Sequence, residues 1–371
     1  MSAAGEADAA VRALFKVNDV FMLPDGETEY RVAYDGRSAA GFEQLVRQLA
    51  PKGLVPTLAG SKEDCVLFVR KRAPLPKVRS RIPVVLALFT LASVAVFGYF
   101  EGEIYPAFGT GIPWYQAAIL YSGAVVAILA VHEAAHRAMS RRSGTAPPTP
   151  FVIPGVPLVT SFLPSLGIIS QQREPAVNRN RFFDYMVAGP LAALGLTLAL
   201  YVAGELTSAA STLQAQGCQM VNGYITACQV NPSVFQVAVD WAVSGFAPAA
   251  TAASRLSPLA DAASVGFLLT FVGLLPLAFF DGGFIASAVL EDRFGRLATY
   301  LGVLALILFD TPNYWALAIV VLLMAGRPVS VQTYDEVSPI SRSRRILFVA
   351  LIAVALLSLP FPQNLGTFPL A

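Results

Sequence analysis

Two histidines and a glutamate at close spacing are the residues of this chain best suited to chemistry. They lie in Val131-His132-Glu133-Ala134-Ala135-His136, and no other histidine occurs among the 371 residues. Residues four apart on a helix share one face, so both imidazoles can reach one Zn²⁺ ion while Glu133 takes a proton from water at the metal. The pattern predicts His132 and His136 as zinc ligands and Glu133 as general base.

The alternative is a chance match, or polar residues that pack between helices. The motif, however, lies inside an apolar run, where ionisable groups are costly and usually face a functional interior. This cost favours the metal site.

A catalytic zinc usually has three protein ligands and one open position, so a carboxylate or thiolate is still needed. Asp281 is the best placed candidate. It lies about 17 residues into an apolar run that starts near Ser264, and His132 lies about 18 residues into one that starts near Trp114. At 1.5 Å per residue, both lie roughly 25 Å from the outer surface. We therefore expect Asp281 to be the third ligand; the alternative is a turn residue ahead of Gly282-Gly283.

The composition is that of a membrane protein. Hydrophobic residues make up 55% of the chain and charged residues 13%, with a mean hydropathy of +0.60. Apolar runs that reach or approach the roughly 20 residues needed for a spanning helix predict seven spans, at 82–100, 114–139, 184–204, 264–290, 297–310, 313–326 and 345–361. A further apolar stretch at 233–247 is expected to lie at the membrane interface rather than to span the membrane.

Lysine and arginine predict the orientation. If the N-terminus is cytoplasmic, the outside segments hold one of the 26 basic residues, Arg255. Seven spans then place the C-terminus outside. No signal peptide is expected in the small, acidic opening sequence. The net charge of +2 reflects cytoplasmic anchoring of a lipid-embedded protein and gives no reason to invoke nucleic acid.

The sequence predicts an all-α polytopic membrane protein of about seven transmembrane helices with a re-entrant β-hairpin-like segment, preceded by a small α+β cytoplasmic domain. That domain shows no catalytic constellation, and we expect a packing module or one that binds a regulator or substrate. The expected divisions are a flexible N-terminus at 1–13, the α+β domain at 14–72, a basic linker at 73–81, the membrane domain at 82–361 and a tail at 362–371.

Three cysteines lie on different predicted sides. Cys65 falls in the cytoplasmic region, where a reduced thiol is expected. Cys218 and Cys228 share the outside loop, where the compartment permits a disulfide, and the sequence leaves that bond open.

The motifs together resemble the site-2 proteases, intramembrane zinc peptidases that cut transmembrane helices. The resemblance covers roughly 82–361. It implies one zinc per chain, with Asp281 as third ligand, and a transmembrane-helix protein as substrate. The plastid, cyanobacterial and archaeal branch is the most similar. The resemblance rests on the histidine motif, Pro276–Gly283, Ala188–Ala193, Leu163–Ile169 and Asp335–Ile340.

Prolines between 147 and 164 exclude a regular spanning helix there, so 151–169 is expected to be a re-entrant or membrane-edge hairpin. The resemblance implies that this hairpin adds an edge strand to unwound substrate. Two departures from the family concern substrate handling. Many family members have asparagine at the position of Gly273, and some have it at that of Ala193, where small residues also occur. The substrate contacts that the resemblance implies are Phe151, Pro154, Gly167, Ile168, Gly189 and Pro276.

Two other functions stay open. One is a zinc-binding scaffold of the same fold with weak or no activity, although a purely structural site needs no general base. The other is a transporter that uses His132, Glu133 and Asp281 as an ion path, although the internal repeats common in transporters are not evident.

Overall fold

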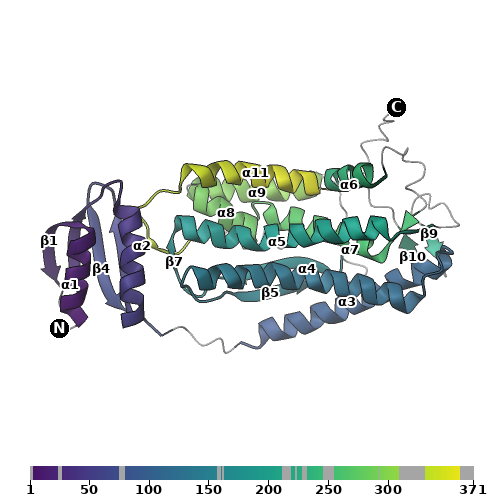
Figure 1. Cartoon of the computed structure of the whole chain (residues 1–371), viewed down its shortest axis with the longest axis horizontal. Coiled ribbons are helices and arrows are strands. Elements are labelled where there is room, and N and C mark those ends of the chain that lie inside the picture. The colour runs from purple at the N-terminus through teal and green to yellow at the C-terminus, as the bar shows by residue number, and fades with distance from the viewer. Residues whose placement is uncertain are drawn as a thin grey trace.

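The computed structural model describes residues 3–23, 27–74, 80–156, 160, 163–210, 219–221, 224–227, 232–244, 255–290, 292–308 and 331–359. A small α/β module lies at one end, and long helices run side by side away from it (Figure 1).

The α/β module at the N-terminal end has its own core, in which Phe42, Leu45 and Leu58 are fully buried. Residues 1–13, expected to be flexible, include a helix that buries Val11. The elements are α1 (Ala3–Leu14), β1 (Lys16–Met22), β2 (Thr28–Ala33), α2 (Ser38–Leu49), η1 (Ala50–Lys52), β3 (Leu54–Gly60) and β4 (Cys65–Lys71).

The sheet of this module continues into the membrane domain. Its order is β1-β2-β4-β3-β12-β7, where β7 (Ala176–Asn178) and β12 (Thr333–Asp335) come from far along the chain. β12 runs parallel to both β3 and β7. The expectation of an all-α membrane domain is therefore wrong. Strands of three residues are too short to show a periodic pattern, and their pairing depends on contacts distant in sequence.

The prediction of seven spanning helices is also wrong for the part of the chain that the structure describes. Three helices there are long and apolar enough to cross a membrane, namely α3 (Ile82–Ala107), α4 (Trp114–Arg142) and α5 (Arg179–Leu206). Further helices are shorter. They are α6 (Val234–Ser244), α7 (Pro258–Leu274), α8 (Asp281–Val289), α9 (Asp292–Leu308) and α11 (Arg342–Ser358).

Two of the sequence predictions fall on segments that the structure does not describe. The sixth expected span, 313–326, lies outside the described residues, as does the tail at 362–371.

A proline breaks the predicted span at 264–290. Leu275 has ψ 143° and ends α7, because a residue before proline is pushed out of helical geometry. Pro276 itself has no N–H to donate to the helix. The chain then turns for five residues, and α8 starts at Asp281. The candidate ligand thus stands at a helix start rather than in the middle of a span.

The proline-rich stretch after α4 forms an antiparallel hairpin of β5 (Thr149–Pro154) and β6 (Ser165–Gln171). Four short strands lie beyond the end of α5. They are β8 (Ala209–Ala210), β9 (Gln219–Val221), β10 (Tyr224–Ala227) and β11 (Arg255–Leu256). Cys218 and Cys228, between which the sequence left a disulfide open, lie outside the described residues.

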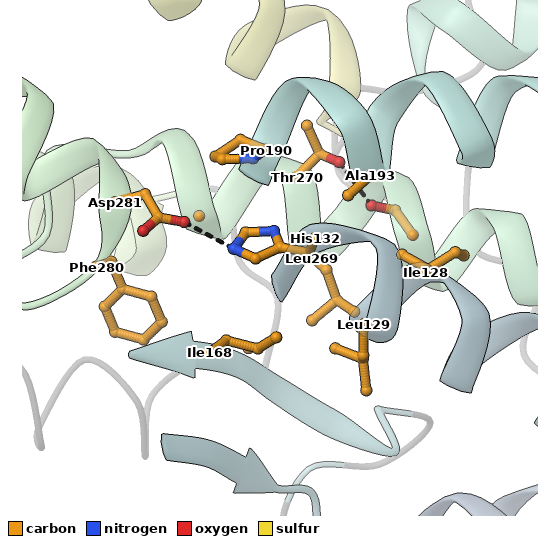
Figure 2. A pocket seen from close by; sticks show the side chains of 13 residues that line it. Ile128, Leu129, His132, Ile168, Pro190, Ala193, Leu269, Thr270, Phe280 and Asp281 are labelled. Carbon is orange, nitrogen blue, oxygen red and sulfur yellow. Dashed lines mark hydrogen bonds and ion pairs between the residues drawn. The ribbon is translucent and has the colours of Figure 1, made fainter. Parts of the chain in front are cut away.

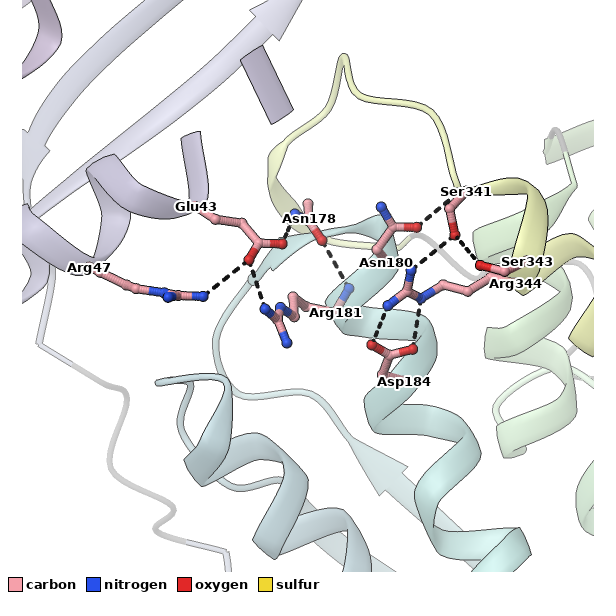
Figure 3. Close-up of polar contacts among 9 residues, drawn as sticks. All are labelled: Glu43, Arg47, Asn178, Asn180, Arg181, Asp184, Ser341, Ser343 and Arg344. Carbon is pink, nitrogen blue, oxygen red and sulfur yellow. Dashed lines mark hydrogen bonds and ion pairs between the residues drawn. The ribbon is translucent and has the colours of Figure 1, made fainter. Parts of the chain in front are cut away.

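Charged contacts join the module to the start of α5 (Figure 3). Glu43 on α2 accepts hydrogen bonds from Asn178 at 3.0 Å and from Arg181 at 2.8 Å. Asn178 also caps α5, since its side chain accepts from the Arg181 backbone N–H. Two bonds from Arg344 of α11 to Asp184, at 2.7 and 2.6 Å, then tie α11 to α5. The first turns of α5 and α11 are thereby fixed to each other and to the module.

Candidate metal centre

Three side chains from α4 and α8 converge on one point. His132 Nε2 lies 2.9 Å from Asp281 Oδ2, His136 Nε2 lies 3.3 Å from Asp281 Oδ1, and the two Nε2 atoms are 3.2 Å apart. His136 and Asp281 are almost fully buried, and the His132 side chain is 14% exposed. Figure 2 shows His132 and Asp281 facing each other. The structure thus brings together the three residues that the sequence singles out as ligands.

The orientation of His136 is set from α5. Its Nδ1 lies 2.9 Å from the backbone carbonyl oxygen of Tyr185, which can only accept, so Nδ1 carries the hydrogen. The lone pair of neutral His136 is then on Nε2 and faces His132 and Asp281. Metal-bound histidines usually donate their second ring N–H in this way.

These residues fit a zinc ion. With bonds of about 2.0–2.1 Å at tetrahedral angles, ligand atoms lie roughly 3.3 Å apart. The two histidine nitrogens are 3.2 Å apart, and they lie 2.9 and 3.3 Å from the two oxygens of Asp281. Asp281 Oδ1 is buried and accepts no hydrogen bond, although a buried carboxylate is costly unless a cation or donors compensate it. Two imidazole nitrogens and a carboxylate are a known catalytic zinc donor set.

Glu133 is oriented by the next turn of its own helix. Arg137 Nε donates to Glu133 Oε1 at 2.7 Å, and the Glu133 side chain is 12% exposed. Its other oxygen, Oε2, is buried without a hydrogen-bond partner. One carboxylate oxygen is therefore held and the other is free to accept a proton.

The turn between α7 and α8 delivers Asp281 to the histidines. Leu277 N–H donates to the Leu275 carbonyl at 2.6 Å, and Phe280 N–H donates to the Leu277 carbonyl at 3.1 Å. Phe279 has φ 70°, a left-handed conformation that usually requires glycine and costs of order 1–3 kcal/mol. After Asp281, a Cβ on Gly283 would lie 2.0 Å from the Leu277 carbonyl oxygen. The absent side chain lets α8 start tightly against the turn.

A small hollow opens beside His132 and Asp281. It admits the centre of a water molecule over about 30 Å³. Of the substrate contacts that the family resemblance implies, Gly167 and Ile168 line it. Gly189 instead lies against the His136 ring. Phe151, Pro154 and Pro276 are not among the lining residues.

Several lining residues were missed from the sequence. Ile128 and Leu129 lie one turn before His132 on the same face of α4, a spacing that could have indicated them. Leu269, Thr270 and Phe280 depend on how α7 and the following turn pack, and no local pattern marks them. Neither the Tyr185 carbonyl nor Arg137 was anticipated as a partner of the motif.

Two histidines and an aspartate held by apolar helices, with a free glutamate oxygen beside them, are the components of a metallopeptidase centre. The chain belongs to peptidase family M50, whose sequence model matches residues 120–309. That family is embedded in membranes, in agreement with the three apolar helices.

Curated relatives carry metalloprotease names. "Probable zinc metalloprotease EGY2, chloroplastic" of Oryza sativa subsp. indica is 26% identical over 65% of this chain and 42% of that protein. "Probable zinc metalloprotease EGY1, chloroplastic" of Arabidopsis thaliana is 25% identical over 68% and 45%, and its counterpart in Oryza sativa subsp. japonica is 26% identical over 51% and 30%. The chain thus spans less than half the length of these relatives, which place it in the plastid branch of the site-2 proteases. No solved structure matches it.

Proposed function

We propose that this protein is an intramembrane zinc endopeptidase that hydrolyses peptide bonds within transmembrane segments of other membrane proteins. The observation that carries the proposal is the buried, unpartnered Oε2 of Glu133, the residue that follows His132 on α4, together with the three converging ligand groups. A structural zinc site has no use for a free carboxylate of this kind, so this observation also argues against the scaffold alternative.

Each residue has a separate task. His132, His136 and Asp281 hold one zinc ion, which when bound supplies Lewis acidity towards water and a scissile carbonyl. Glu133 accepts the proton of the attacking water on Oε2 and returns it to the leaving amine. Arg137 keeps the Glu133 carboxylate in place through Oε1. The Tyr185 carbonyl keeps the His136 proton on Nδ1.

The β6 strand provides a surface for an extended substrate. Ser170 lies opposite Pro150, and because proline has no N–H, this is not a doubly hydrogen-bonded pair. The alternation of antiparallel pairs then directs the backbone groups of Ser170 and Ile168 away from β5, to the free edge of β6, with which no strand among the described residues pairs. A helix must unwind before its amide can be cut, and strand addition at this edge would hold the unwound segment.

The protein would work as a multi-pass membrane protein with a cytoplasmic N-terminus. The basic residues support this orientation, since Arg81 directly precedes α3, and Arg70, Lys71 and Arg72 lie a few residues further back. The N-terminal module would then lie in the cytoplasm, where it could bind a regulator or substrate.

The test compares wild type with Glu133→Gln, each reconstituted in lipid with a panel of single-span helices, with bound zinc measured in both. The proposal expects zinc in both proteins and cleavage in wild type alone. Zinc in both without any cleavage would favour the scaffold, and undiminished cleavage by Glu133→Gln would overturn the mechanism.

A further inference from the structure

The hollow beside the metal centre has small residues at two positions of its wall. Gly273 lies in the last turn of α7, Ala193 lies on α5, and both line the hollow. A Cβ added to Gly273 would meet no atom within 4 Å, so it would project into open space. At Gly273 the wall of the hollow is therefore not filled by any side chain of the described residues.

The rest of the wall is apolar. Ile128 and Leu129 come from α4, Pro190 from α5 and Leu269 from α7 (Figure 2). Thr270 is the hydroxyl residue in the lining, and its Oγ1 already donates to the Gly266 carbonyl at 2.9 Å. Apart from the metal ligands, the lining side chains offer no free polar group. A charged or amide group placed here would lose its hydration without gaining hydrogen bonds.

The hollow adjoins both the metal ligands and strand β6. His132 and Asp281 form one part of its wall, and Gly167 and Ile168 of β6 form another. A segment paired with the free edge of β6 points alternate side chains to opposite faces. One face of such a segment is towards the hollow.

We propose that this hollow is a subsite for one small apolar side chain next to the scissile bond, and that Gly273 and Ala193 set its size. The inference rests on the proposed peptidase function and names its substrate class, helices with an alanine- to valine-sized residue at that position. One water needs roughly 10–15 Å³ by the same measure, so about 30 Å³ holds two or three groups of that size. A phenyl ring is too large.

The test uses single-span helices in which glycine, alanine, valine or phenylalanine is scanned through the middle turns. Gly273→Ala and Ala193→Val reduce the hollow. Gly123→Ala is the matched control, because that glycine is exposed on α4 and its added Cβ also meets no atom within 4 Å. Cleavage is measured as kcat/KM, and binding of the same helices is measured in a Glu133→Gln background.

We expect wild type and Gly123→Ala to prefer alanine or valine over phenylalanine at one position. Gly273→Ala should lower kcat/KM for the valine helix by roughly 10-fold or more relative to the alanine helix, the usual effect of one methyl group in an apolar pocket. Affinity in the Glu133→Gln background should shift in the same order.

Two results separate the possible failures. Cleavage by every variant with an unchanged size preference would overturn the subsite and leave the peptidase function standing. No cleavage by wild type would overturn the proposed function. In that case binding decides: a size preference that Gly273→Ala shifts supports the subsite, and a flat profile overturns it.

Discussion

Gly189 on α5 faces the His136 imidazole, and replacing it with alanine should disable the metal centre. The added Cβ would lie 2.3 Å from Nε2, 2.6 Å from Cδ2 and 2.8 Å from Cε1 of that ring, whereas ordinary contacts begin at 3.4 Å. The ring would have to move by about 1 Å. It has nowhere to go, because His136 is fully buried and its Nδ1 is bonded to the Tyr185 carbonyl.

The magnitude follows from that displacement. Changing a partner that only orients a ligand typically costs 10–100-fold in metal affinity, and here the ligand itself moves. Gly189→Ala should therefore weaken zinc binding by about 100-fold. Overpacking of this kind also costs roughly 1–3 kcal/mol of stability.

Zinc affinity is best measured by competition with a chromophoric chelator, on purified protein in detergent. Gly195→Ala, two turns further along α5, is the matched control, since its Cβ would meet no atom within 4 Å. The thermal midpoint of each variant checks the fold. A folded Gly189→Ala protein with wild-type zinc affinity would refute the reasoning about His136.

Two further predictions concern the junction between the module and the helices. Burial alone would raise the pKa of Glu43, but hydrogen bonds from Arg181 and Asn178 outweigh it and hold the pKa below the ordinary 4.5. A lowered folded-state pKa means that stability is present above the unfolded pKa and is lost as pH falls through the folded value. The thermal midpoint of wild type should thus fall more steeply below about pH 4.5 than that of Glu43→Gln, and identical pH curves would contradict this. Glu174 is 4% exposed and binds Arg72 through both oxygens, the Ala146 N–H and the Tyr334 hydroxyl. Glu174→Ala should lower the free energy of unfolding by about 2–3 kcal/mol, and Lys52→Ala, which removes an exposed pair with Glu6, by less than about 1 kcal/mol; equal losses would count against a special role for Glu174.

The metal centre follows from the sequence to a large extent because its key spacing is local. His132 and His136 share a helix face by geometry alone, and Asp281 follows from comparing positions in two apolar runs. The orientation of these ligands does not follow. The Tyr185 carbonyl and the contact of Gly189 with His136 depend on how α5 packs against α4, which no local pattern encodes.

The fold was predicted less well. Composition indicates a membrane protein, and α3, α4 and α5 lie close to the expected spans. The break at Pro276 could have been inferred from the effect of proline on the preceding residue. It was not predicted, because the residues on both sides are apolar and together resemble one continuous span. β7 and β12, which extend the sheet of the N-terminal module, are three residues each, and their pairing is a property of the assembled chain.

The central claim is that His132, His136 and Asp281 together hold one zinc ion. Zinc K-edge absorption spectroscopy on purified wild type and Asp281→Ala tests it directly, together with the metal content of each. We expect one zinc per chain in wild type, with two imidazole ligands and the rest oxygen, and severe loss of zinc from Asp281→Ala. Sulfur in the coordination sphere, or a full complement of zinc with an unchanged spectrum in Asp281→Ala, would contradict it.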